Sequence, residues 1–117
     1  MPTPDENALY KTINDDFAVA GQLDPDQMPA IAEAGFKAVI CNRPDGEAPA
    51  EPQFDAISAA AAAAGLEARY IPVSNQVGLT PENVTDMKAA LSEMPGPVLA
   101  YCRSGARSAK LYEIATG

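Results

Sequence analysis

The stretch 98-VLAYCRSGARS-108 decides the fold that we expect for this chain. Residues 98–101 form a short, fully apolar run, which is typical of a buried central strand in a parallel sheet. Helical character resumes at residues 108–115, after a turn that contains Gly105. In an open α/β sheet the functional site lies at the carboxyl ends of the strands, where such turns lead into helices. We therefore expect the chemistry of the protein at residues 102–108.

Cys102 stands at the position in this turn where a thiolate is stabilised. Backbone N–H groups and the dipole of a helix N-terminus attract anions, and they lower the pKa of a thiol. The predicted anion-binding loop consists of Arg103, Ser104, Gly105, Ala106, Arg107 and Ser108. The simpler alternative is that Cys102 is a small buried apolar residue. Two arginines and two hydroxyls in the next six positions argue against that alternative.

The rest of the chain alternates short apolar runs with helical stretches. We expect strands at residues 17–22, 36–41 and 68–73, and helices at residues 25–34, 54–64 and 80–94. Pro72 should end the third of these strands or place it at an edge of the sheet. This order of strands and helices along the chain predicts one compact α/β domain at residues 13–117, with a mostly parallel sheet of four to five strands flanked by helices. Residues 1–12 are expected to form a flexible N-terminal arm.

Composition excludes several classes of function. Sixteen acidic and eight basic residues give a net charge of −8, which opposes binding to nucleic acid or to an anionic membrane surface. The absence of His excludes a His-dependent triad and a His-carboxylate zinc site, and two cysteines cannot form a four-thiolate site. We therefore expect no metal and no cofactor. No secretory signal is recognisable at the N-terminus, so a cytoplasmic location is expected.

Two segments of the chain resemble known families. The run 101-YCRSGARS-108 strongly resembles the active-site loop of rhodanese sulfurtransferases, and 20-AGQLDPDQMPAIAEAGFKAVICNRPDGE-47 is similar to the beta-lactamase-hydrolase-like family, also called DUF442. This second family belongs beside the cysteine-dependent protein phosphatases, and some members are fused to a metallo-β-lactamase-fold partner of the persulfide dioxygenase kind. The resemblance implies a fold like that of dual-specificity phosphatases or rhodaneses, and either sulfur or phosphoryl transfer.

Three departures from the phosphatase pattern favour sulfur transfer. Protein tyrosine phosphatases place five residues between the nucleophilic Cys and the phosphate-binding Arg, whereas four separate Cys102 from Arg107. Asn75 stands where dual-specificity phosphatases carry a general-acid Asp, and it cannot donate a proton as a carboxylic acid does. Tyr101 replaces their usual His. The leading hypothesis is a rhodanese-type sulfurtransferase that moves a sulfane sulfur through a Cys102 persulfide to a thiol acceptor.

The expected partners follow from this hypothesis. Arg103 and Arg107 would bind a small anionic donor, either thiosulfate or a persulfide. The resemblance adds a metallo-β-lactamase-fold persulfide dioxygenase as a further partner. One alternative is a phosphatase that hydrolyses phosphate monoesters through a Cys102 phosphoenzyme. Another is a non-enzymatic sensor of anions or persulfides that uses the same loop.

Three further residues are candidates near the same edge of the sheet. Arg43 and Asp45 follow the strand at residues 36–41, and in the phosphatase alternative they would act as a substrate contact and a general acid. Turn chemistry and a surface ion pair explain the same residues more simply. Cys41 could act as a resolving thiol after oxidation of Cys102, although burial as a small apolar residue is the simpler interpretation.

Overall fold

The computed structural model describes residues 10–45, 53–74 and 76–117 of the chain. Its elements are β1 (Lys11–Asn14), β2 (Phe17–Ala20), the 3-10 helix η1 (Pro25–Gln27), α1 (Met28–Glu33), β3 (Ala38–Cys41), α2 (Phe54–Ala63), β4 (Glu67–Tyr70), α3 (Pro81–Glu93), β5 (Val98–Tyr101) and α4 (Ala106–Thr116). The five strands form one sheet in the order β1-β2-β5-β3-β4. All pairs are parallel except β1 with β2. The predicted α/β architecture is confirmed.

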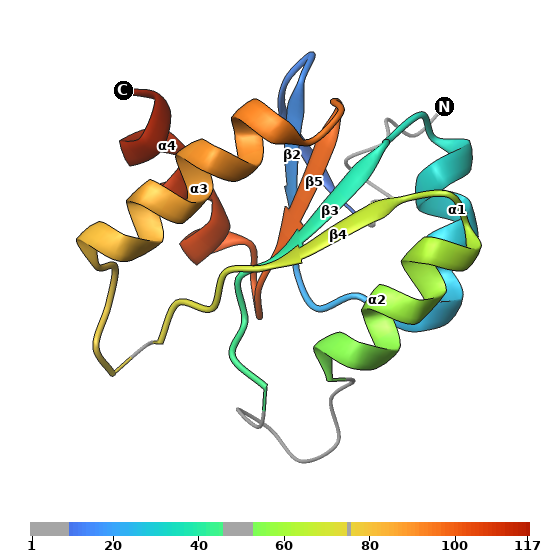
Figure 1. The fold of residues 1–117 in the computed structure, drawn as a ribbon, viewed down its shortest axis with the longest axis horizontal. Coiled ribbons are helices and arrows are strands. Elements are labelled where there is room, and N and C mark those ends of the chain that lie inside the picture. Colours follow the sequence, from blue (N-terminus) through green and yellow to red (C-terminus); the bar gives the residue numbers. More distant parts are fainter. Residues whose placement is uncertain (1–9, 46–52, 75) are drawn as a thin grey trace.

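Helices cover both faces of the sheet (Figure 1). Helices α1 and α2 pack on one face, and α3 and α4 pack on the other. Strand β5 lies in the middle, and its residues alternate between the two layers: Leu99 and Tyr101 belong to the core under α1 and α2, while Val98 and Ala100 belong to the core under α3 and α4. Since both faces of β5 are covered, its apolar run is fully buried, as the sequence predicts.

Several boundaries differ from the sequence prediction. Lys11 and Thr12, expected in the flexible arm, pair with β2 as part of β1, whose exposed and mostly polar residues gave no strand signal. Residues 1–9 of that arm lie outside the described part of the chain. The strand predicted at residues 68–73 ends at Tyr70, two residues before Pro72, and β4 is an edge strand. Helix α4 begins two residues earlier than predicted, directly after Gly105.

The helices of the described residues are short. None of them is both long and apolar enough to cross a membrane.

Candidate active site

The loop between β5 and α4 holds Cys102 at the carboxyl end of the central strand. The Cys102 side chain is fully buried, and its Sγ accepts a hydrogen bond from the backbone N–H of Gly105 at 3.0 Å. Gly105 has φ +91° and is the residue before the first turn of α4. This left-handed conformation favours glycine, and it lets the chain turn tightly enough for the loop N–H to face the sulfur. The Cys102 sulfur and the N-terminus of α4 therefore meet as the sequence predicts.

The loop favours the thiolate form of Cys102. Burial alone raises the pKa of a thiol, because it penalises the charged form. Hydrogen bonding from the backbone N–H groups of Ser108, Ser104, Arg107 and Gly105 outweighs burial, so that the pKa of Cys102 is lowered from its ordinary value. The backbone thus supplies the stabilisation that a neighbouring His would provide in a protein that contains one.

The end of the neighbouring strand β2 and the residues after it contact this loop through backbone hydrogen bonds. The Cys102 N–H donates to the carbonyl oxygen of Ala20 at 3.2 Å, and the Gln22 N–H donates to the carbonyl oxygen of Arg103 at 3.4 Å. A Cβ atom on Gly21 would lie 3.1 Å from that same Arg103 oxygen, so only glycine fits there without movement. The sequence contains Gly21 but gives no sign that it contacts a loop some 80 positions later, and sequence reasoning missed it.

The Arg43 side chain is buried and contacts the segment after β2. Its side chain is 5% exposed, and Nη1 donates to Oε1 of Gln22 at 2.8 Å. The Gln22 Nε2 in turn donates to the carbonyl oxygen of Leu23. The expected surface position of Arg43 is therefore wrong, because the carboxyl end of β3 places its side chain against the segment after β2. Through Gln22, Arg43 supports the loop that holds Cys102.

The two arginines of the loop lie in different environments. Arg107 is half-buried on the first turn of α4, and its Nη1 donates to the carbonyl oxygen of Val73 at 2.7 Å. Arg103 is exposed. The hydroxyls also differ: Ser104 is exposed and accepts a hydrogen bond from the Ala106 N–H, whereas Ser108 is fully buried and its hydroxyl has no hydrogen-bond partner among the described residues.

The other candidates occupy structural positions. The Asp45 carboxylate accepts a hydrogen bond at 2.8 Å from the N–H of Phe54, the first residue of α2, where a negative charge is favourable. Cys41 is buried beside Tyr101, its thiol donates to the Arg43 carbonyl oxygen at 3.2 Å, and burial raises its pKa, so it remains a thiol. Asn75 lies outside the described residues.

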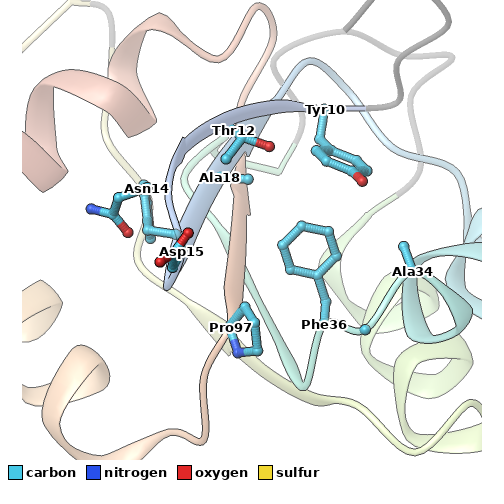
Figure 2. A pocket seen from close by; sticks show the side chains of 10 residues that line it. Tyr10, Thr12, Asn14, Asp15, Ala18, Ala34, Phe36 and Pro97 are labelled. Atoms are coloured by element: carbon cyan, nitrogen blue, oxygen red, sulfur yellow. The ribbon is translucent and has the colours of Figure 1, made fainter. Parts of the chain in front are cut away.

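Two pockets lie at opposite ends of the sheet. One, of about 230 Å³, adjoins the catalytic loop and is lined by Val73, Ser74, Gly78, Leu79, Ala106, Arg107 and Lys110. The other, of about 260 Å³, lies at the amino ends of the strands, where Tyr10 and Phe36 meet edge to face (Figure 2). Its described lining holds Asp15 and no Lys or Arg, so it does not suit an anion. The pocket beside Arg107 does, and sequence reasoning missed Lys110 as part of it.

The two thiols should titrate in different pH ranges. We expect the ultraviolet absorbance of thiolate to rise below the ordinary thiol range in Cys41→Ser and above it in Cys102→Ser, because the pKa of Cys102 is lowered and that of Cys41 is raised. Since the folded state favours the Cys102 thiolate, its contribution to stability is present above the unfolded pKa and is lost as pH falls through the folded pKa. Coincident titrations of the two variants would contradict the assignment.

Comparison with solved structures gives the class of the protein. A candidate phosphatase from Neisseria meningitidis shares 30% sequence identity with a TM-score of 0.78, and the match covers 89% of this chain and 72% of that one. A candidate phosphatase of the DUF442 type from Shewanella putrefaciens has a TM-score of 0.80 at 23% identity, over 92% of this chain and 70% of that one. This second likeness concerns the fold alone. The fold and the cysteine loop together define a phosphatase-like α/β domain.

Residues 9–117 match the family described as beta-lactamase hydrolase-like protein, phosphatase-like domain, and the chain belongs to that family. The beta-lactamase hydrolase-like protein of Agrobacterium fabrum is 37% identical over 100 residues, which are 86% of this chain and 23% of the relative. The chain thus spans about a quarter of the length of such curated relatives. The family resemblance inferred from the sequence is confirmed.

The leading functional hypothesis is wrong. A phosphatase-like family and phosphatase-like neighbours replace the rhodanese-type sulfurtransferase, its Cys102 persulfide and its sulfur donors. The spacing argument failed for a physical reason: four of the loop's backbone N–H groups act on the Cys102 sulfur, and N–H groups of this kind bind anions whether four or five residues separate Cys from Arg. The phosphatase alternative fits these findings better.

Proposed function

We propose that this domain hydrolyses phosphate monoesters through a phosphoenzyme on Cys102. The observation that carries the proposal is the position of the Cys102 sulfur, which accepts hydrogen bonding from backbone N–H groups at the N-terminus of α4 and has its pKa lowered by them. The same N–H groups can bind the non-bridging oxygens of a phosphoryl group. Arg107, on the first turn of the same helix, adds the fixed positive charge that phosphoryl transfer requires.

The reaction divides into two displacements. The Cys102 thiolate attacks phosphorus, an S–P bond forms, and the P–O bond to the organic group breaks. Water then attacks the phosphoenzyme, the S–P bond breaks, inorganic phosphate leaves and the thiolate is restored. The buried Ser108 hydroxyl, which has no hydrogen-bond partner among the described residues, is available to donate to the departing sulfur. Ester and water are consumed, and alcohol and phosphate are formed.

The leaving group restricts the class of substrate. No carboxylate is among the described residues that line the pocket beside the loop, and Asp45 is engaged at the N-terminus of α2. An organic group that departs without a proton donor must be a stable anion. A phenol, with a pKa of about 10, leaves far more readily than an aliphatic alcohol, whose pKa is much higher and lies near that of water. Aryl phosphates are therefore the favoured class.

Binding also requires the loop to move. Cys102 is 0% exposed, so loop atoms that cover the sulfur must shift outward when a phosphate enters. Arg107, now bonded to the Val73 carbonyl oxygen, is placed to turn from that oxygen to those of the phosphate. Its guanidinium presents donors in a planar fork that matches two phosphate oxygens at once.

Intact mass spectrometry after a single turnover tests the proposal. Incubation with an aryl phosphate that has a good leaving group, followed by an acid quench, should add the mass of one phosphoryl group to the wild type and to Cys41→Ser. Cys102→Ser should remain unlabelled and should not release the phenol. Phenol release that persists in Cys102→Ser would overturn the proposal, as would a wild type that neither acquires the label nor releases phenol.

A further inference from the structure

The pocket beside the catalytic loop combines an apolar surface with two cations. Val73, Leu79 and Ala106 supply apolar side chains, and Arg107 and Lys110 supply positive charge. At about 230 Å³ it is smaller than the roughly 300–1,000 Å³ of sites that enclose a whole drug-sized ligand. It therefore suits one compact group of a larger molecule. Because Arg107 belongs both to this pocket and to the Cys102 loop, a group bound there is next to the phosphate site.

The Lys110 ammonium group is placed to bind a negative charge on that group. Lys110 lies three residues after Arg107 on α4, and side chains at this spacing project from the same face of a helix. Its present partner is Glu113, at 3.8 Å, and both side chains are largely exposed, at 62% and 75%. Exposed pairs of this kind are weak, so the ammonium group is available to an incoming anion.

The region around Lys110 is rich in positive charge, whereas the chain as a whole is acidic. The chain carries a net charge of −8, yet three of its eight cations, Arg103, Arg107 and Lys110, fall within eight residues. No Asp or Glu is among the described residues that line the pocket. A phosphate bound at Cys102 uses the loop N–H groups and Arg107, which leaves Lys110 as a cation in the pocket that the phosphate does not require.

We infer that Lys110 forms a subsite for a second anionic group, so that the preferred substrate is an aryl phosphate whose ring also carries a carboxylate or a phosphate. The inference rests on the proposed function for the position of the first phosphate. The ring lies against Leu79 and the aliphatic stem of Lys110, the phosphate lies in the Cys102 loop, and the second anion meets the Lys110 ammonium group.

Matched esters test the subsite. The pair is para-(carboxymethyl)phenyl phosphate and its carboxamide, which differ in charge and hardly in size. The wild type should turn over the carboxylate about three- to fivefold more efficiently than the amide, the range of one exposed ion pair. Lys110→Gln should remove this preference by lowering kcat/KM for the carboxylate more than for the amide, and Lys110→Arg should restore it. Lys88→Gln, an exposed lysine on α3, makes the same change of net charge and should keep the preference.

Binding measurements separate this inference from the proposed function. Calorimetry with Cys102→Ser and the matching non-hydrolysable phosphonates should show the same ratio of affinities, and the same loss of that ratio when Lys110→Gln is added. Equal carboxylate-to-amide ratios with Lys and with Gln at position 110 would overturn the subsite. Absence of turnover of both esters by the wild type, with the binding ratio intact, would overturn the proposed function and leave the subsite standing.

Discussion

Replacing Arg107 with Met should lower kcat/KM for an aryl phosphate by about 10³-fold, the lower end of what a cation is worth at a transferring phosphoryl group. Charge develops on the phosphoryl oxygens in the transition state, and Arg107 is the half-buried cation at the start of α4, within the loop that holds Cys102. Arg107→Lys should recover only part of the loss, because an ammonium group keeps the charge but cannot bind two oxygens through a planar fork.

A matched surface arginine separates this effect from a loss of stability. Arg69 on the edge strand β4 pairs with Glu93 at 2.6 Å, and both side chains are well exposed, at 36% and 59%. Arg69→Met makes the same chemical change and should leave kcat/KM within about twofold of the wild type, because an exposed pair contributes little. Thermal unfolding of both variants measures how much stability Arg107→Met loses with the hydrogen bond to Val73. If Arg107→Met were as active as Arg69→Met, Arg107 would have no role in the reaction.

The parts of the fold that a local pattern could predict were those with strong hydrophobic periodicity. The apolar run of β5, the glycine turn and the amphipathic stretch of α4 place Cys102 at the carboxyl end of a central strand. The same reasoning missed β1, because four exposed residues, three of them polar, look like a loop when they lie at the edge of a sheet. Pairing with β2 makes them a strand, and pairing is a property of two segments together.

For a related reason, the contacts that support the Cys102 loop could not be predicted from the sequence. The carbonyl oxygens of Ala20 and Val73 hold the Cys102 N–H and the Arg107 side chain, and a backbone carbonyl is the same in every residue. The contact between Arg43 and Gln22 joins residues 21 positions apart, and only the fold brings them together. A local motif could be predicted, whereas the contacts that distant segments make with it could not.

The functional hypothesis failed where side-chain identity was given too much weight. The four-residue interval between Cys102 and Arg107, and the Asn at position 75, were read as evidence against phosphate chemistry. A loop of this kind binds anions mainly through its backbone N–H groups, and here Gly105 and the start of α4 set their direction. These groups bind a phosphoryl group or a sulfur anion alike, so spacing alone could not distinguish the two reactions. Family membership distinguished them.

Gly105→Ala should impair both stability and the reactivity of Cys102. At φ +91° a side chain is strained at a cost of about 1–3 kcal/mol, and the new Cβ would lie 3.3 Å from the carbonyl oxygen of Ala20. Relief of this contact moves the Gly105 N–H away from Cys102 Sγ, to which it now donates at 3.0 Å. We expect the free energy of unfolding to fall by about 1–3 kcal/mol, the pKa of Cys102 to rise towards its ordinary value, and single-turnover phosphorylation to slow at neutral pH.

Gly65→Ala is the control that isolates the loop contact from the backbone strain. Gly65 lies two residues after the end of α2 with φ +85°, and a Cβ there would meet nothing within 4 Å. It should lose comparable stability, as measured by denaturant unfolding, while thiolate titration and phosphorylation of Cys102 stay as in the wild type. If both variants lost stability and both kept the lowered pKa of Cys102, the Gly105 N–H would contribute nothing to the thiolate. Because the two glycines share a backbone conformation and differ in what surrounds them, a pKa change confined to Gly105→Ala would assign the reactivity of Cys102 to the shape of the loop.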